Sequence, residues 1–338
     1  MRAMQLERIV DLARESKPLT RVVLDAPTPG PGEVLIAVST CGVCHTELDE
    51  IEGRTPPPRL PVIPGHEVVG RVAALGPGCR RFREGDRVGV GWIHSSDGSR
   101  AENIHAAFVA TGRDVNGGYA EYMVVGETYA YPIPECFSDV EAAPLLCAGG
   151  VGFRSLGLTG LENGQPLGLT GFGGSGHLVL QLAKHLYPDS PVFVFARSAP
   201  ERAFARELGA DWSGATEDRP PELLGAIIDT TPAWKPVLAA LERLAPGGRL
   251  VINAIRKEAG DAGLLAGIRY EDHLWQEKEI KSVANVTHFD LEAFLPIAAE
   301  AGLRVETETY PLEEANRALA ELARGDIRGA KVLEIGTD

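Results

Sequence analysis

The chain has 338 residues, of which 44% are hydrophobic and 24% are charged. This length exceeds what one hydrophobic core usually supports, so we expect two domains. The formal net charge of −14 excludes nonspecific nucleic-acid binding, which needs clustered Lys and Arg to neutralise phosphates.

No segment is apolar for long enough to span a bilayer, and Glu7 and Arg8 interrupt the apolar run that a secretory signal would need. Five cysteines, an odd number in a chain without an export signal, argue against a disulfide framework. We therefore expect a cytoplasmic protein with no membrane and no nucleic-acid partner.

The first part of the chain, from about residue 20 to residue 135, is predicted to be mainly β. It is rich in β-branched residues and broken by Gly and Pro. Its predicted strands read EVLIAVST, HEVVGRVAAL, DRVGVGW and AEYMVV.

Within this β part, residues 41–67 concentrate possible metal ligands. Cys44 stands directly before His45 and Thr46, and about two dozen residues later His66 is followed by Glu67. Thiolate and imidazole are ligands that zinc prefers, and a catalytic zinc site leaves one coordination position open. The stretch therefore predicts the core of a catalytic metal site that needs a further protein ligand.

Cys147, in AAPLLCAGG, is the best candidate for that further ligand, since Cys79 and Cys136 lack flanking residues of ligand type. Cys41 and Cys44 form a CxxC pair, which raises a redox-active dithiol as an alternative. Such a motif usually opens a helix beside a βαβ unit, whereas this one follows a β segment. We therefore interpret Cys41 as a packing thiol.

After residue 144, short apolar strands alternate with amphipathic helices. This alternation is typical of parallel strands joined by crossover helices, so residues 150–287 are predicted to form a doubly wound domain. Two helices and a last strand, KVLEIG, follow. That strand either extends the parallel sheet or returns to the first part of the chain.

A glycine-rich loop joins the first of these strands to its helix. Its glycines have GxGxxG spacing, which lets the backbone approach a pyrophosphate at the helix N-terminus. The alternative is a strand-to-helix turn without a ligand. The residues expected to bind a dinucleotide are Gly171, Phe172, Gly173, Gly174, Ser175 and Gly176.

The end of the next strand bears on the choice of cofactor. An NAD site normally offers a carboxylate there, but this chain reads FARS. Arg197 and Ser198 could instead hold a 2′-phosphate, so we predict that NADP(H) is preferred over NAD(H). The alternative for Arg197, and our expectation for Lys331 and Arg328, is a solvated surface position.

Five segments together resemble a known family. CGVCHTEL, PVIPGHEVVG, GDRVGVGW, APLLCAG and GFGGSGH occur in the order found in zinc-dependent alcohol dehydrogenases of the medium-chain dehydrogenase/reductase superfamily. The resemblance covers essentially the whole chain. It implies an α/β fold with a GroES-like β-rich catalytic domain, residues 1–149 and 288–338, and a Rossmann doubly wound parallel-sheet domain, residues 150–287.

The resemblance also implies residue roles. The zinc ligands would be Cys44, His66 and Cys147. Glu67 would be a carboxylate beside the metal or an intermittent ligand, Thr46 would relay the alcohol proton, His45 would lie near the cofactor pyrophosphate, and Trp92 would line the substrate pocket.

Some positions depart from the family pattern. No cysteine lies between Cys79 and Cys136, so the four-cysteine structural zinc site of many relatives cannot form. We expect one catalytic zinc per subunit and no structural zinc, and we interpret His94 and His105 as exposed loop histidines. Asp49 stands where some relatives have a relay histidine, which leaves the last step of proton release open.

The predicted protein is an NAD(P)-dependent alcohol dehydrogenase that transfers hydride between a small alcohol or aldehyde and a nicotinamide cofactor. The family leads us to expect a homodimer or homotetramer. The alternatives are a zinc-free quinone or enone reductase of the same superfamily and a cofactor-binding protein without turnover.

Overall fold

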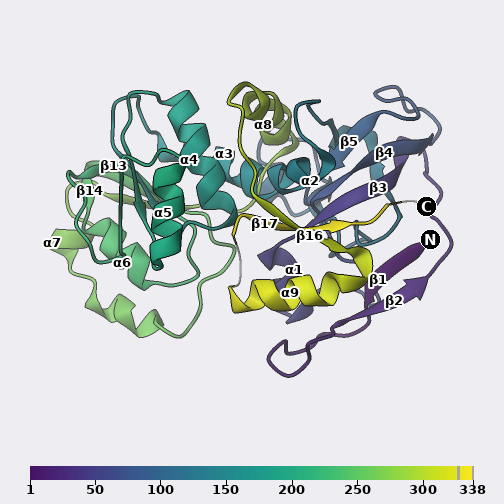
Figure 1. Cartoon of the computed structure of the whole chain (residues 1–338), viewed down its shortest axis with the longest axis horizontal. Helices are drawn as coiled ribbons and strands as arrows, with labels where there is room; N and C mark the ends of the chain where they lie inside the picture. Colours follow the sequence, from purple (N-terminus) through teal and green to yellow (C-terminus); the bar gives the residue numbers. More distant parts are fainter. Residues whose placement is uncertain (326–327, 337–338) are drawn as a thin grey trace. The chain divides into compact units, whose positions relative to one another are not determined.

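The computed structural model describes residues 1–325 and 328–336, and the chain divides into two compact units (Figure 1). Unit 1 comprises Met1–Gly150, Asn285–Ala299 and Val305–Asp338, and unit 2 comprises Val151–Ala284 and Glu300–Arg304. Within the described ranges, no helix combines the length and the apolar character needed to cross a membrane.

Unit 1 is built on a seven-stranded sheet in the order β16-β17-β3-β4-β5-β9, with β8 also paired to β3. Burial alternates along most of β3, as expected for a strand with one face on a core. The strands are β3 (Glu33–Val43), β4 (Val68–Leu75), β5 (Arg87–Val90), β8 (Tyr122–Gly126), β9 (Ala130–Pro132), β16 (Thr307–Pro311) and β17 (Ala330–Glu334).

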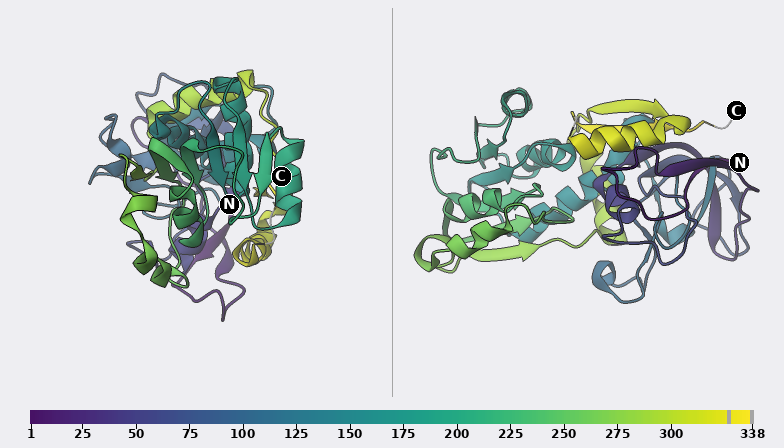
Figure 2. Two further views of the ribbon diagram at one scale, coloured as in Figure 1. Left: turned by 90° about the vertical axis from the view of Figure 1, so that its left-hand side faces the viewer. Right: turned by 90° about the horizontal axis from the view of Figure 1, so that it is seen from below.

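The last strand resolves an alternative that the sequence left open. β17 pairs antiparallel with β3, with Leu333 opposite Cys41, so the chain returns to the sheet of unit 1. Helix α9 (Ala315–Arg324) lies beside β16 and β17 in the further views (Figure 2). It also packs against α1 (His45–Ile51), the helix that follows β3.

The remaining elements of unit 1 are short, except for α8. β1 pairs with β2, and β6 pairs with β7. Their bounds are β1 (Arg2–Leu6), β2 (Leu19–Val23), β6 (Ile93–Ser95), η1 (Glu102–Ile104), β7 (Val109–Ala110), η2 (Glu127–Tyr129), α2 (Asp139–Ala142), η3 (Ala143–Leu146), α8 (His288–Glu300) and η5 (Leu312–Glu314).

Unit 2 contains a six-stranded sheet whose pairs are all parallel, in the order β12-β11-β10-β13-β14-β15. This is the order of a doubly wound dinucleotide-binding fold, in which the third, second and first strands precede the fourth, fifth and sixth. The predicted parallel-sheet domain is thereby confirmed. The strands are β10 (Leu167–Thr170), β11 (Val192–Phe195), β12 (Trp212–Gly214), β13 (Leu224–Asp229), β14 (Leu244–Ile252) and β15 (Glu279–Ser282).

Helices connect these strands. β10 and β11 are buried at every residue, which fits strands covered on both faces. The helices are α3 (Ala148–Thr159), α4 (Gly174–Leu186), α5 (Ala199–Glu207), α6 (Lys235–Leu241), η4 (Ala262–Gly267) and α7 (Tyr270–His273).

Candidate metal centre and cofactor loop

Unit 1 brings together four side chains of ligand type, Cys44, His66, Glu67 and Cys147, with one ligand atom from each within 4.8 Å of the others. Strand pairing explains how distant residues meet. Cys44 directly follows β3 and Glu67 directly precedes β4, and these strands are antiparallel neighbours. Cys147 is supplied by the turn between η3 and α3.

The spacing of the two thiols suits zinc. Their sulfur atoms are 4.0 Å apart. Two thiolates on a tetrahedral zinc, each at a bond length of roughly 2.3 Å, would be about 3.8 Å apart. Two sulfur donors, an imidazole and a carboxylate form a donor set that zinc accepts, so these residues fit that metal.

Glu47, in the first turn of α1, orients the imidazole. Its Oε1 lies 2.5 Å from Nδ1 of His66, and both side chains are buried. Its Oε2 accepts a hydrogen bond of 2.8 Å from the backbone N–H of Cys44. Since Nδ1 is taken, Nε2 of His66 is the nitrogen left for a metal, and it is buried without a hydrogen-bond partner in the described part of the chain.

The side chains of the cluster shift one another's pKa values. The Cys147 thiol, as hydrogen-bond donor, lowers the pKa of Cys44 well below its usual range, although burial opposes it. The same hydrogen bond and burial raise the pKa of Cys147. Burial by itself would lower the pKa of His66, but Glu47 and Cys44 raise it well above its usual range.

Helix α1 also carries the other residues to which the sequence assigned catalytic roles. Thr46 is buried, and its Oγ1 lies 3.6 Å from Sγ of Cys44. His45 is exposed. The Asp49 carboxylate is buried and accepts a hydrogen bond of 2.5 Å from Nε of Arg54.

Cys41 lies outside the group of four. It is a fully buried residue of β3, opposite Val68 of β4, and burial raises the pKa of its thiol. A thiol of this kind is a poor nucleophile, because the thiolate is the reactive form. These properties suit the packing role that the sequence suggested.

Trp92 follows β5 and lies beside the imidazole. Its ring centroid is 6.3 Å from that of His66 and 5.2 Å from that of Phe108. The Arg113 guanidinium lies 5.4 Å from the Trp92 ring centroid. The Trp92 ring thus adjoins His66, one of the four residues of the group, and the Arg113 guanidinium contacts that ring.

In unit 2, the glycine loop turns sharply from β10 into α4. Gly171 has a φ of 83°, and a Cβ there would lie 2.6 Å from Oγ1 of Thr230. A Cβ on Gly176 would lie 2.8 Å from the carbonyl oxygen of Gly171. Glycine is therefore required at both positions, whereas a Cβ on Gly173 would meet open space.

The other three loop residues differ in their surroundings. Phe172 is buried, with its ring centroid 5.5 Å from that of Phe204, whereas Ser175 is half-buried. Gly174 is the first residue of α4. The free backbone N–H groups of such a helix start form an anion site of the kind that a pyrophosphate occupies.

The segment after β11 holds a cation and no carboxylate. The Arg197 side chain is exposed. Ser198 caps α5: its Oγ accepts a hydrogen bond from the backbone N–H of Glu201 and donates one of 2.7 Å to the Glu201 carboxylate. Arg202 binds the carbonyl oxygens of Ala196 and Arg197 at 2.8 and 2.9 Å, which fixes the backbone of this turn.

Comparison with known proteins decides the family. Residues 30–135 match the alcohol dehydrogenase GroES-like domain. The chain is 42% identical over 332 residues to the "Probable alcohol dehydrogenase AdhA" of Mycobacterium tuberculosis, with 95% of this chain and 94% of that protein covered. The chain belongs to the alcohol dehydrogenases of the medium-chain dehydrogenase/reductase superfamily.

The dehydrogenase has further relatives. It is 33% identical over 327 residues to an alcohol dehydrogenase of Moraxella sp., with 92% and 94% of the two chains covered. Among solved structures, a cinnamyl alcohol dehydrogenase of Sorghum bicolor superposes with a TM-score of 0.81 at 28% identity, covering 98% and 97% of the two chains. The predicted fold class and reaction are confirmed: the dehydrogenase is an oxidoreductase of alcohols and aldehydes that uses a nicotinamide cofactor.

Lys331 corrects an expectation from the sequence. Its side chain is 1% exposed, so the solvated surface position expected for it is wrong. Its Nζ donates hydrogen bonds to Glu308 at 2.8 Å, to the Tyr310 hydroxyl at 2.6 Å and to Glu321 at 3.0 Å. The dehydrogenase uses this cation to join β17, β16 and α9, whereas Arg328 is exposed.

A second correction concerns His94, in strand β6. His94 is half-buried, and its Nε2 lies 3.3 Å from the carbonyl oxygen of Val124, so it is not an exposed loop histidine. His105 is exposed as expected. Burial lowers the pKa of His94.

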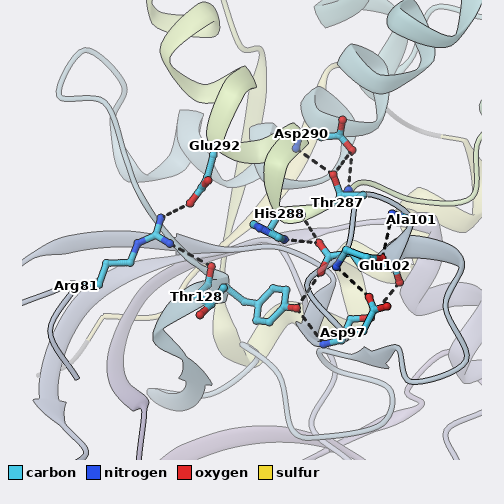
Figure 3. A network of polar contacts seen from close by, with 12 residues as sticks. Arg81, Asp97, Ala101, Glu102, Thr128, Thr287, His288, Asp290 and Glu292 are labelled. Carbon is cyan, nitrogen blue, oxygen red and sulfur yellow. Dashed lines mark hydrogen bonds and ion pairs between the residues drawn. The ribbon is translucent and has the colours of Figure 1, made fainter. Parts of the chain in front are cut away.

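The segment between β6 and β7, which has no cysteines, is held by hydrogen bonds to the Glu102 carboxylate, which the sequence did not single out. Glu102 is fully buried, and Figure 3 shows it at the centre of a polar network. Its Oε1 accepts from the backbone N–H of His288 at 2.5 Å and lies 2.8 Å from Nδ1 of that residue. Its Oε2 accepts from the Tyr129 hydroxyl at 2.9 Å, which in turn accepts from the backbone N–H of Ser96.

Sequence reasoning also missed Glu50 and Arg113 near the metal ligands. Glu50 is three residues after Glu47 on α1, a spacing that puts both side chains on one face of the helix. That spacing was the only signal in the sequence, and it required knowing that the helix begins directly after Cys44. Nothing in the local sequence indicated that Arg113 would reach Trp92.

Proposed function

We propose that the dehydrogenase binds one catalytic zinc ion per chain through Cys44, His66 and Cys147, with Glu67 as an exchangeable fourth ligand. The observation that carries this proposal is the group of four ligand atoms within 4.8 Å of one another. The hydrogen bond between Nδ1 of His66 and the Glu47 carboxylate, which leaves Nε2 of His66 for a metal, adds independent support.

Bound zinc would supply a Lewis acid that makes an alcohol hydroxyl more acidic and polarises an aldehyde carbonyl, and the nicotinamide would accept or give the hydride. The residues of the chain hold the substrate and move its proton. The Thr46 hydroxyl both donates and accepts hydrogen bonds, so beside Cys44 it suits the relay of the alcohol proton. Trp92 offers an aromatic wall to the substrate.

The onward path of the proton stays a prediction. Asp49 is ion-paired with Arg54, which restricts its carboxylate. His45, the first residue of α1, is exposed, which is compatible with contact to a cofactor pyrophosphate.

Replacement of single cysteines tests the metal proposal. We expect Cys44→Ser and Cys147→Ser to lose both bound zinc and alcohol-dependent reduction of the cofactor. Cys136→Ser, which changes an exposed thiol outside the group, is the matched control and should keep both. Full activity of Cys44→Ser without bound metal would contradict the proposal and favour a zinc-free reductase.

We also propose that NADP(H) is preferred over NAD(H). An exposed Arg197 follows β11 where an NAD site would offer a carboxylate, and guanidinium pairs well with phosphate. Ser198 is engaged in capping α5, so it supports the phosphate site mainly by fixing the turn.

The ratio of kcat/KM for NADPH to that for NADH tests this preference. We expect a ratio well above one in the unaltered protein. Arg197→Ala should lower kcat/KM for NADPH by about tenfold or more, the size of a lost charged hydrogen bond, and should leave the value for NADH unchanged. A preference for NADH in the unaltered protein would overturn the proposal.

The assembly as homodimer or homotetramer stays a prediction. Cofactor binding without turnover of any alcohol or aldehyde, in zinc-loaded protein, would support the alternative of a binding protein. Light scattering at a series of protein concentrations would give the assembly state.

A further inference from the structure

Glu50, on the last turn of α1, carries a carboxylate with no visible partner. The residue is 1% exposed, and both carboxylate oxygens are buried without a hydrogen bond to any described residue. Burying such a group is costly unless it is hydrogen-bonded. An unsatisfied polar group in a native protein therefore calls for a partner such as water, an ion or a ligand.

The position of Glu50 places it beside the metal ligands. It follows Thr46 by four residues and Glu47 by three on the same helix, so the three side chains share one face of α1. That face is directed at the metal ligands, since Glu47 contacts His66 and Thr46 contacts Cys44. Glu50 itself lies outside the group of four ligand residues.

Four side chains influence the Glu50 carboxyl. Burial raises its pKa well above the usual range, and the Glu47 carboxylate adds to the rise. His66, Arg113 and the Trp92 indole act in the opposite direction, so all four groups lie near this carboxyl.

The Trp92 indole N–H, a hydrogen-bond donor without an acceptor, lies next to the Glu50 carboxyl, which has no donor among the described residues. Nε1 of Trp92 is buried and forms no hydrogen bond of acceptable geometry with a described residue, although it approaches Glu50. Arg113 does not fill the need, because its guanidinium is committed to Asp114 through contacts of 2.8 and 2.7 Å. The Trp92 ring itself is held between Arg113 and Phe108.

The charges around this pair of groups select what can bind there. A ligand carboxylate would face the carboxyl groups of Glu47 and Glu50, and like charges repel strongly where water is excluded. A ligand ammonium could donate to Glu50, but it has no acceptor for the Trp92 N–H. A neutral hydroxyl group can donate to the Glu50 carboxyl and accept from the Trp92 N–H at the same time.

We propose that Glu50 and the Trp92 indole N–H together bind a second hydroxyl group of the substrate, so that the dehydrogenase prefers diols and hydroxyaldehydes to unsubstituted alcohols of the same length. The inference rests on the proposed function, since it requires the reacting hydroxyl to lie at the metal ligands. It makes Glu50 a residue that determines specificity.

The test compares n-butanol with each butanediol that keeps a primary alcohol. For the unaltered protein we expect kcat/KM for the best diol to exceed that for n-butanol by about tenfold or more, the size of a hydrogen bond to a charged or well-placed polar group. Glu50→Leu should bring this ratio to about one, because kcat/KM for the diol falls far more than kcat/KM for n-butanol. Glu50→Gln should keep part of the preference, because its amide oxygen still accepts a hydrogen bond.

Glu52→Gln is the matched control, since Glu52 pairs with Arg54 and lies just beyond α1. It should leave the ratio unchanged. If Glu50→Leu does not fold, Trp92→Phe replaces it: this variant keeps an aromatic ring, removes the N–H and should lower the ratio.

A ratio near one for every diol in the unaltered protein would overturn the inference. So would an equal loss on diol and n-butanol in Glu50→Leu, or an unchanged ratio in Trp92→Phe. In all these cases zinc content and turnover of n-butanol would leave the proposed function standing. Absence of zinc and of alcohol turnover in the unaltered protein would overturn both.

Discussion

At the scale of single residues, Glu47 connects the local structure of α1 to the chemistry of the metal ligands. One carboxylate oxygen accepts a hydrogen bond from the backbone N–H of Cys44 at the start of the helix. The other forms a hydrogen bond with Nδ1 of His66. The same side chain therefore sets the positions of two of the proposed zinc ligands. Such carboxylate–histidine contacts fix the imidazole tautomer and raise the basicity of the ligating nitrogen.

We predict that Glu47→Leu weakens zinc binding by about 10- to 100-fold, the range typical for loss of a partner of a ligating histidine. Competition with a chromophoric chelator measures this affinity. Glu47→Gln should recover part of it, because an amide oxygen can still accept from Nδ1 of His66. An unchanged zinc affinity in Glu47→Leu would show that the imidazole is oriented by other contacts.

At the scale of elements, the segment between β6 and β7 contains no cysteine and is held to the start of α8 by hydrogen bonds. Glu102 in η1 binds the backbone and the side chain of His288, the first residue of α8. Nearby, Asn103 donates a hydrogen bond of 2.9 Å to the carbonyl oxygen of Asn285. The loop and the start of α8 are thus joined through polar contacts buried from solvent.

We predict that Glu102→Leu lowers the free energy of unfolding by about 3 kcal/mol, because it removes one partner of a buried network and leaves the Tyr129 hydroxyl and the His288 N–H unpaired. Amide hydrogen exchange locates the effect. Exchange should rise most at residues 95–104 and 285–289. A rise in exchange spread evenly over the chain would contradict the view that Glu102 stabilises this segment locally.

The contact between β17, β16 and α9 gives a prediction about acid stability. Hydrogen bonds from Tyr310 and Lys331 lower the pKa of Glu321 from 4.5 to about 2. A lowered pKa means that the stabilisation is fully present above the unfolded value and is lost as the pH falls through the folded value.

The free energy of unfolding of the unaltered protein should therefore fall between about pH 4.5 and pH 2 more steeply than that of Glu321→Gln. Urea unfolding at a series of pH values, read by circular dichroism, measures both curves. Parallel curves over this range would mean that the Glu321 carboxylate contributes no stability.

At the scale of the whole molecule, the sequence predicted the repeating parts of the fold better than the unique contacts. Alternation of strands and helices predicted the parallel sheet of unit 2, because each strand–helix unit carries its own pattern. The partner of β17 stayed open, since KVLEIG has an apolar pattern that any sheet could accept. The burial of Lys331 was not predicted, because a lysine is usually exposed and the strand sequence gives no sign of the acidic groups from β16 and α9 that pair with it.

The same distinction applies to the candidate site. Ligand residues in CxxCH and GHE motifs could be found from residue type and spacing, and the third, Cys147, from its flanking segment. Glu50 and Glu102 could not be found in this way. Glu102 matters because it contacts a residue far along the chain, and Glu50 because its buried carboxylate has no hydrogen-bond partner among the described residues. The physical cause is that a buried carboxylate has no distinctive local pattern in the sequence.

We propose that alcohol oxidation needs a zinc ion held by Cys44, His66 and Cys147. Elemental analysis of the purified protein, before and after a chelator, paired with the rate of alcohol-dependent NADPH formation, tests this requirement. We expect one zinc per chain, loss of zinc and rate together, and recovery of both on adding zinc back. A full rate in protein that contains no metal would contradict it.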